Sequence, residues 1–180
     1  MKKALEEMTL EELWQLFPIF LTEHKACWQD WYKEMKEHLL EIIPKEAVND
    51  INHVGSTAIP GIMAKPIIDI LLEINESFDM ENIASLCVKD GWIIMNRSEG
   101  RIYLNYGYTP SGYAEKVFHL HLRNPGDNKE IEFRDKLIAS PEKAKEYEKL
   151  KISLWKKYEH DRDGYTFAKG DFVDNIIKEG

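Results

Sequence analysis

The stretch from His53 to Asp69 combines residue types that hold phosphate with a carboxylate on an apolar segment. Gly55 lets the backbone approach a ligand closely, and Ser56 and Thr57 add hydroxyl donors. Converging N–H groups of such a turn cradle an anion. We therefore predict a phosphate-binding turn at residues 53–57, with an ordinary strand-to-helix turn capped by Ser or Thr as the alternative.

Asp69 interrupts a dense apolar run from Pro66 to Ile74. Such a run predicts a central strand that is buried on both faces. An unpaired carboxylate is costly inside a protein, so we expect Asp69 to have a metal ion or a cation as its partner. Lys65 lies on the same face if the strand already runs there. It is then either the ion-pair partner of Asp69 or a cation that neutralises phosphate.

A second group of polar residues lies on the strand predicted over Glu115 to Arg123. Alternation places His119, His121 and Arg123 on one face of that strand and apolar residues on the other. Histidines at i and i+2 can share a metal ion, carry protons or donate hydrogen bonds to phosphate. We predict that this pair belongs to a site, although a single histidine there would more often be structural.

The preceding strand presents a similar polar face, formed by Arg101, Tyr103 and Asn105. If the two strands pair as a hairpin, the two faces combine into one polar floor, whereas an exposed sheet face would show the same pattern. Arg134 opens the helical segment that follows. It is either a contact to phosphate or the partner of Asp135 in a local ion pair.

Capping signals and periodicity predict the elements that position these residues. Helix starts are expected at Thr9, where Glu12 completes a capping box, and at Ser140, which precedes Pro141. A longer helix from Glu23 to Ile43 carries an apolar stripe and ends at Pro44. A further helix is expected over Met80–Lys89, helices over residues 131–180, and strands over Pro66–Ile74, Trp92–Met95, Arg101–Tyr106 and Glu115–Arg123. This order predicts a single α+β domain.

Composition narrows the function classes. The 180 residues have 43% hydrophobic and 31% charged content, which is typical of a globular chain. A net charge of −8 argues against general nucleic-acid binding, which needs a basic surface. Cys27 and Cys87 stand far apart and are expected to be reduced thiols. We predict a cytoplasmic protein, because no membrane-length apolar run or signal-peptide pattern is present.

In their order along the chain, the motifs resemble the signature of the GrpB family. The resemblance rests on the sequences His-Val-Gly-Ser-Thr-Ala-Ile-Pro-Gly at 53–61, Ala-Lys-Pro-Ile-Ile-Asp-Ile at 64–70, His-Leu-His-Leu at 119–122 and Phe-Arg-Asp at 133–135. It implies a nucleotidyltransferase-like mixed β-sheet flanked by helices over residues 31–180. Residues 1–30 would then be an N-terminal helical extension.

GrpB proteins are similar to the nucleotidyltransferase superfamily, in which a Gly-Ser turn holds a triphosphate and an Asp-x-Asp/Glu pair holds Mg²⁺. The resemblance implies Asp69, His119 and His121 as catalytic residues and as ligands of Mg²⁺ or Mn²⁺. Leu71 stands where the second carboxylate would lie, so either Asp69 holds the ion with help from His119 or His121, or catalysis of the usual two-metal kind is lost. Substrate contacts are predicted for His53, Gly55, Ser56, Thr57, Lys65, Arg123 and Arg134.

Two functions follow from these predictions. The first is transfer of a nucleotidyl group from a nucleoside triphosphate to the hydroxyl of an unknown acceptor. The second is a non-catalytic module that binds a nucleotide or another phosphorylated small molecule. The resemblance adds a folding-accessory role, because GrpB domains are also fused to dephospho-CoA kinase. A metal hydrolase built on the two histidines is a third and weaker alternative.

Overall fold

A mixed five-stranded sheet forms the centre of the protein in a computed structural model that describes residues 3–179. The strands are β1 (Val48–Val54), β2 (Ile68–Ile74), β3 (Ile93–Ser98), β4 (Arg101–Thr109) and β5 (Gly112–Arg123), in the order β1-β2-β5-β4-β3. β2 and β5 run parallel, and the other neighbours are antiparallel. The α+β class and the mixed sheet are therefore confirmed.

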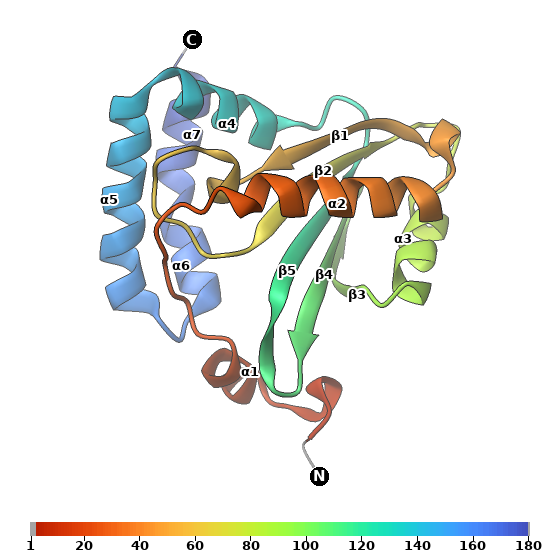
Figure 1. Cartoon of the computed structure of the whole chain (residues 1–180), viewed down its shortest axis with the longest axis horizontal. Coiled ribbons are helices and arrows are strands. Elements are labelled where there is room, and N and C mark those ends of the chain that lie inside the picture. Colours follow the sequence, from red (N-terminus) through yellow and green to blue (C-terminus); the bar gives the residue numbers. More distant parts are fainter. Residues whose placement is uncertain (1–2, 180) are drawn as a thin grey trace.

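Helices lie around this sheet in two groups (Figure 1). The helices and 3-10 turns are η1 (Leu5–Glu7), α1 (Leu10–Leu16), α2 (Cys27–Ile42), η2 (Lys45–Ala47), η3 (Ser56–Ala58), α3 (Met80–Lys89), α4 (Lys129–Ala139), α5 (Pro141–Tyr158), α6 (Arg162–Ala168) and α7 (Gly170–Lys178). α2 crosses the sheet, α3 lies beside β3, and α4 to α7 form a separate stack, while α1 lies near the tip of the β4–β5 hairpin. No helix of residues 3–179 is long and apolar enough to cross a membrane.

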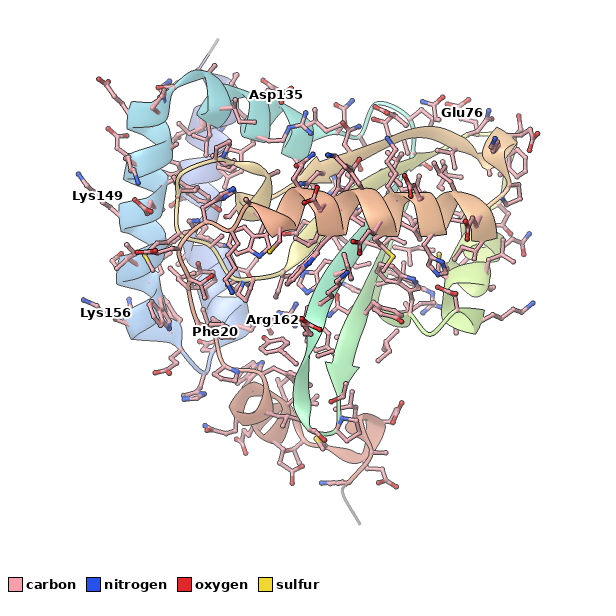
Figure 2. The ribbon with its side chains drawn as sticks, viewed as in Figure 1. Phe20, Glu76, Asp135, Lys149, Lys156 and Arg162 are labelled. Carbon is pink, nitrogen blue, oxygen red and sulfur yellow. The ribbon has the colours of Figure 1, made fainter. Side chains whose placement is uncertain are left out.

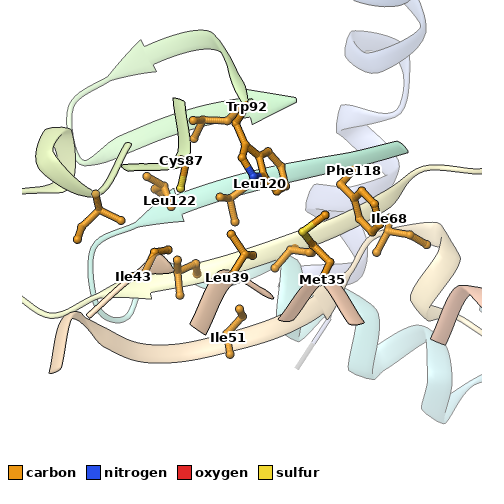
Figure 3. Packing of buried hydrophobic residues seen from close by; sticks show 14 of the residues in the cluster. Met35, Leu39, Ile43, Ile51, Ile68, Cys87, Trp92, Phe118, Leu120 and Leu122 are labelled. Atoms are coloured by element: carbon orange, nitrogen blue, oxygen red, sulfur yellow. The ribbon is translucent and has the colours of Figure 1, made fainter. Parts of the chain in front are cut away.

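One face of the sheet carries the main hydrophobic core (Figure 3). α2 places Trp28, Met35 and Leu39 against it at helical spacing, and Leu120 of β5 is fully buried between them. Because side chains alternate along a strand, the residues between these apolar positions point to the opposite face. That opposite face holds Asp69 and the two histidines.

A smaller core joins the stack of C-terminal helices to the long loop between β1 and β2. Ile59 and Ile62 of this loop, each 1% exposed, pack with Phe133 of α4 and Tyr147 of α5. Ser140 caps α5 by accepting a hydrogen bond from the Lys143 N–H, and Pro141 occupies the first turn, as predicted. The loop is therefore held between sheet and helices.

The element boundaries differ from the prediction at several places. The strand over Pro66–Ile74 begins two residues later, because Ile67 N–H bonds to the carbonyl of Lys65 in a tight turn. The long helix begins at Cys27 rather than Glu23. The predicted division at residue 30 falls inside α2, whose Trp28 is already fully buried in the main core.

Candidate functional site

The loop from Gly55 to Ile67 is irregular in path but held firmly at several points. α5 clamps the Met63 peptide from both sides: Glu148 accepts its N–H at 2.6 Å, and the ammonium of Lys151 donates to its carbonyl. Thr22 and Ala64 form an isolated antiparallel bridge with two backbone hydrogen bonds. These contacts fix the position of Lys65 just before the start of β2.

Gly55 brings this loop against Asp69. Its backbone has a φ of 72°, and a Cβ added there would lie 2.4 Å from Asp69 Oδ2. Only glycine tolerates both the left-handed conformation and this close approach. The predicted need for glycine at the turn therefore has a physical cause in the Asp69 carboxylate.

Asp69 and the two histidines form one cluster on the polar face of β2 and β5. Asp69 Oδ1 lies 3.0 Å from His121 Nε2 and 3.3 Å from His119 Nδ1. The parallel register that pairs Asp69 with His119 and Leu71 with His121 produces this arrangement. The Asp69 side chain keeps 26% of its surface exposed, so solvent reaches the cluster.

The charges of the cluster follow from its hydrogen bonds. Burial by itself would raise the pKa of Asp69, but the hydrogen bonds of His119 and His121 outweigh it and hold that pKa well below its usual range. Burial lowers the pKa of His119 to about 4, against the opposing effect of Asp69. At neutral pH the cluster therefore contains an ionised carboxylate and a neutral His119.

The neighbours of His119 fix its tautomer. Arg162 Nη2 lies 3.2 Å from His119 Nε2, and a guanidinium can only donate. Nε2 must therefore accept, which leaves the proton on Nδ1, where it faces Asp69. The Tyr108 hydroxyl lies 2.8 Å from the same Nε2. His119 is thus held between a carboxylate on one side and an arginine with a tyrosine on the other.

Lys65 and Arg162 add positive charge beside the cluster. Burial and then the nearby Lys169 and Arg162 lower the pKa of Lys65 to about 7, while Asp69 opposes this shift. The ammonium lies 5.4 Å from the centre of the Tyr165 ring. Within residues 3–179 it makes no hydrogen bond or ion pair. Lys65 is therefore not the ion-pair partner of Asp69, and it has donors to spare.

His53 and Thr57 point inward instead of towards this cluster. His53 Nε2 lies 2.9 Å from the Thr57 hydroxyl, which donates to the carbonyl of Ile67 at 3.1 Å. Their exposed fractions are 5% and 2%, and the Tyr32 ring stacks on His53. The structure gives both side chains a role in shaping the turn, whereas Ser56 remains half-buried at its surface.

The two predicted arginines are also committed to internal contacts. Arg123 is 1% exposed and donates to Glu130 at 2.8 Å, with its guanidinium 4.5 Å from the centre of the Tyr103 ring. Arg134 bonds to Asp135 and donates to the carbonyl of His53 at 2.7 Å. The local ion pair is thus present, and Arg134 fastens α4 to the end of β1.

Tyr108 and Arg162 are the site residues that the sequence did not reveal. Tyr108 lies on β4 just past the predicted strand, and Arg162 begins α6, where Asp161 accepts the Gly164 N–H at 2.8 Å. The segment Asp-Arg-Asp-Gly indicates only a solvated turn when read alone. No local signal in it points to a histidine 43 positions earlier.

Comparison with known proteins agrees with this arrangement of motifs. The sequence model of the GrpB protein family matches residues 18–179. The chain belongs to the GrpB family. The glutamate-rich protein GrpB of Alkalihalophilus pseudofirmus is 36% identical over 89% of this chain and 95% of its own length. A UPF0157 protein of Streptomyces coelicolor is 27% identical over 86% of this chain and 80% of its own length.

A crystal structure of the conserved protein GrpB from Enterococcus faecalis shows the same fold. It superimposes with a TM-score of 0.76 at 28% identity and covers 89% of this chain and 96% of its own. The family match begins at residue 18, so α1 of this GrpB chain lies outside it.

The donor set of this GrpB chain does not fit a Mg²⁺ ion held by two carboxylates. Leu71 is fully buried, and the next carboxylate on that face, Glu73, accepts from the N–H of Gly126 and the amide of Asn128, both at 3.1 Å. Residues 3–179 contain no group of three or more His, Cys, Asp or Glu side chains arranged to hold a metal ion. Metal binding at Asp69, His119 and His121 stays a prediction.

Proposed function

We propose that this GrpB chain binds the phosphate groups of a small molecule, for example of a nucleoside triphosphate, beside Asp69. One observation carries the proposal: Lys65 and Arg162 converge on the Asp69 cluster, and the Lys65 ammonium has no acceptor within residues 3–179. A cation without an acceptor on a half-buried side chain is costly, and a phosphate oxygen would supply that acceptor.

The charges around Lys65 favour the binding of an anion, although the chain as a whole has a negative net charge. The chain has a net charge of −8, yet the charges that act most strongly on Lys65 are those of Lys169, Arg162 and Lys151, with Asp69 as the opposing negative one. Positive charges gathered in a partly buried place focus their field and attract anions. Ser56 adds a hydroxyl beside Gly55, where a phosphate can approach the turn.

Side-chain cations take the role that a divalent ion has in the related transferases. Lys65 and Arg162 neutralise phosphate charge without a second carboxylate, which agrees with the presence of Leu71. Binding is therefore expected to persist when divalent ions are chelated. A bound Mn²⁺ would have to replace the protons through which both histidines face Asp69.

Isothermal titration calorimetry of the full chain tests this proposal. Sodium tripolyphosphate and ATP are titrated in EDTA into the parent protein, into Lys65→Ala and into Lys149→Ala, an exposed lysine on α5 that serves as the matched control. Because hydrogen bonds to charged groups contribute about 1.5–3 kcal/mol, Lys65→Ala should weaken binding about tenfold or more. Lys149→Ala should bind like the parent. Absence of binding in the parent, or equal effects of the two variants, would contradict the proposal.

Transfer of the nucleotidyl group is the second candidate, favoured by the Asp69–His119 pair. Asp69 holds the Nδ1–H tautomer, so Nε2 carries no proton; it would take one from an attacking hydroxyl that displaces Arg162 and Tyr108 from it. The hydroxyl oxygen would bond to the α-phosphorus, the bond to pyrophosphate would break, and the proton would pass to Nε2. The low pKa of His119 makes it a weak base, which is why binding ranks first.

A labelling assay tests the transfer. ATP or GTP labelled in the α-phosphate, the group that is transferred, is incubated with the protein and cell extract in either EDTA or Mn²⁺. His119→Gln should abolish labelling of the acceptor while it leaves the affinity for tripolyphosphate within about twofold, because the proton acceptor is lost and the cations remain. If labelling is absent in the parent with and without metal, the chain is a binding module.

A further inference from the structure

A cavity of about 180 Å³ lies at an uncovered edge of β5. β5 pairs with β4 from Gly112 onwards, but β2 joins its other edge only from Phe118. The stretch of β5 before Phe118 is therefore left without a neighbouring strand. Segments 18–22 and 65–67 close the space opposite this edge and form its walls.

Three aromatic rings form part of the walls of this cavity. Phe20, Trp31 and Tyr113 all line it, and the rings of Phe20 and Tyr113 meet edge to face with centroids 6.1 Å apart. Figure 2 shows Phe20 on the irregular segment that connects α1 to α2. Flat aromatic walls in a space of this size suit a planar ring, which gains stacking energy there.

The cavity is connected to the phosphate site in two ways. Lys65 lines the cavity and has Asp69 and Arg162 as charged neighbours. From the other side, Tyr113 contacts the Tyr108 ring at a centroid distance of 5.3 Å, and Tyr108 bonds to His119. A ligand that reaches from the cavity to the Asp69 cluster would thus pass along Lys65 without leaving the protein surface.

We propose that the aromatic cavity holds the base of a nucleotide whose phosphates bind at Lys65 and Arg162. This inference rests on the proposed phosphate binding and makes it specific: the ligand is a nucleotide, and not a phosphorylated sugar or free polyphosphate. A sugar would leave the aromatic walls without a ring to stack on them. Glu115 at the cavity is an acceptor, which suits a base edge that carries an amino group.

Calorimetry in EDTA separates the base from the phosphates. ATP, GTP and tripolyphosphate are titrated into the parent protein, into Phe20→Leu and into Phe167→Leu, whose ring is 88% exposed on α6 and away from the cavity. Stacking of one base contributes enough for the better nucleotide to bind about tenfold tighter than tripolyphosphate, although tripolyphosphate carries at least as much charge. Phe20→Leu should remove most of that gain and leave tripolyphosphate unchanged, while Phe167→Leu should match the parent.

The outcomes distinguish this inference from the proposed function. If tripolyphosphate and both nucleotides bind the parent equally, the base assignment is wrong and phosphate binding stands. If Phe20→Leu weakens tripolyphosphate as much as the nucleotide, the base assignment is also wrong, because stacking acts on the nucleotide alone. If none of the three ligands binds the parent, both proposals fall. The comparison within the parent needs no variant and so does not depend on the folding of Phe20→Leu.

Discussion

The two ends of the polar face shared by β2 and β5 contain similar residue types in opposite states. At the Asp69 end, formed by Asp69, His119 and His121, the carboxylate is 26% exposed, and within the described residues 3–179 the nearby Lys65 ammonium has no hydrogen-bond acceptor. At the Glu73 end, formed by Glu73 and Arg123 with their partners, Arg123 is 1% exposed and Glu73 is 4% exposed. One end is open to solvent, and the other is closed by contacts within the protein.

The difference shows that alternation along a strand places polar groups but does not decide their use. At the Glu73 end, the turn after β5 and the start of α4 supply hydrogen-bond partners. Gly126 and Asn128 donate to Glu73, and Glu130 accepts from Arg123. At the Asp69 end, Arg162 and Tyr108 contact His119, and Arg162 brings more positive charge instead of a carboxylate. An ion cluster whose charges are paired within the protein stabilises the fold, whereas a solvent-exposed cluster with excess positive charge can bind an anion.

Removal of Arg123 should have the largest effect on stability. Arg123→Ala leaves Glu130 and Asp127 without their buried partner, so we expect the free energy of unfolding to fall by about 3 kcal/mol. Urea denaturation measures this change. The matched control is Arg97→Ala, whose ion pair with Glu81 is 54% exposed on both sides and should contribute less than about 1 kcal/mol. Similar losses in both variants would show that the Glu73 end is not a structural cluster.

Gly55 and Gly61 offer a matched pair at the Asp69 end. Both have a left-handed φ, of 72° and 74°, but only a Cβ at Gly55 would meet Asp69. Gly61→Ala should cost about 1 kcal/mol from backbone strain, and Gly55→Ala about twice that, because the carboxylate must move. Thermal unfolding and the tripolyphosphate titration measure both variants. Equal stability and equal affinity in the two variants would show that the contact between Gly55 and Asp69 has no consequence.

The pH dependence of phosphate affinity should show a smaller effect at the same end. Free Lys65 has a pKa of about 7, and a bound phosphate would raise it, so binding takes up a proton above pH 7. Affinity is therefore highest below pH 7 and falls as the pH rises, by about twentyfold between pH 7.5 and 9.0 when the bound lysine stays protonated. Calorimetry with ATP in EDTA measures this, since ATP is already fully ionised in that range. Lys65→Arg, which stays charged, should flatten the profile; an unchanged slope in that variant assigns the proton to another group.

Local patterns in the sequence predicted much of the fold. The helix Met80–Lys89 was predicted at its observed bounds, the Ser140 cap follows from capping chemistry, and β4 and β5 pair as the hairpin that would join their polar faces. Alternation placed His119 and His121 together on the polar face of their strand. These features depend on neighbours in the chain, so the sequence alone contains their signal.

Contacts between distant segments could not be predicted in this way. Arg162 reaches His119 only because α6 folds back on the sheet, and the inward orientation of His53 depends on Tyr32 and Thr57. Arg123 was predicted to contact substrate, but in the structure it forms an ion pair with Glu130 on the following helix. Pairing of charges across the fold is a tertiary property, and strand periodicity does not report it.

A crystal structure of the full chain grown with ATP and Mn²⁺, with data collected at the manganese absorption edge, tests the central claim most directly. We expect phosphate oxygens within hydrogen-bond distance of Lys65 and Arg162, the base in the cavity against the rings that line it, Phe20 and Tyr113, and no manganese signal on Asp69. Phosphates held through a Mn²⁺ ion on Asp69 and the histidines, or bound elsewhere on the protein, would contradict the account.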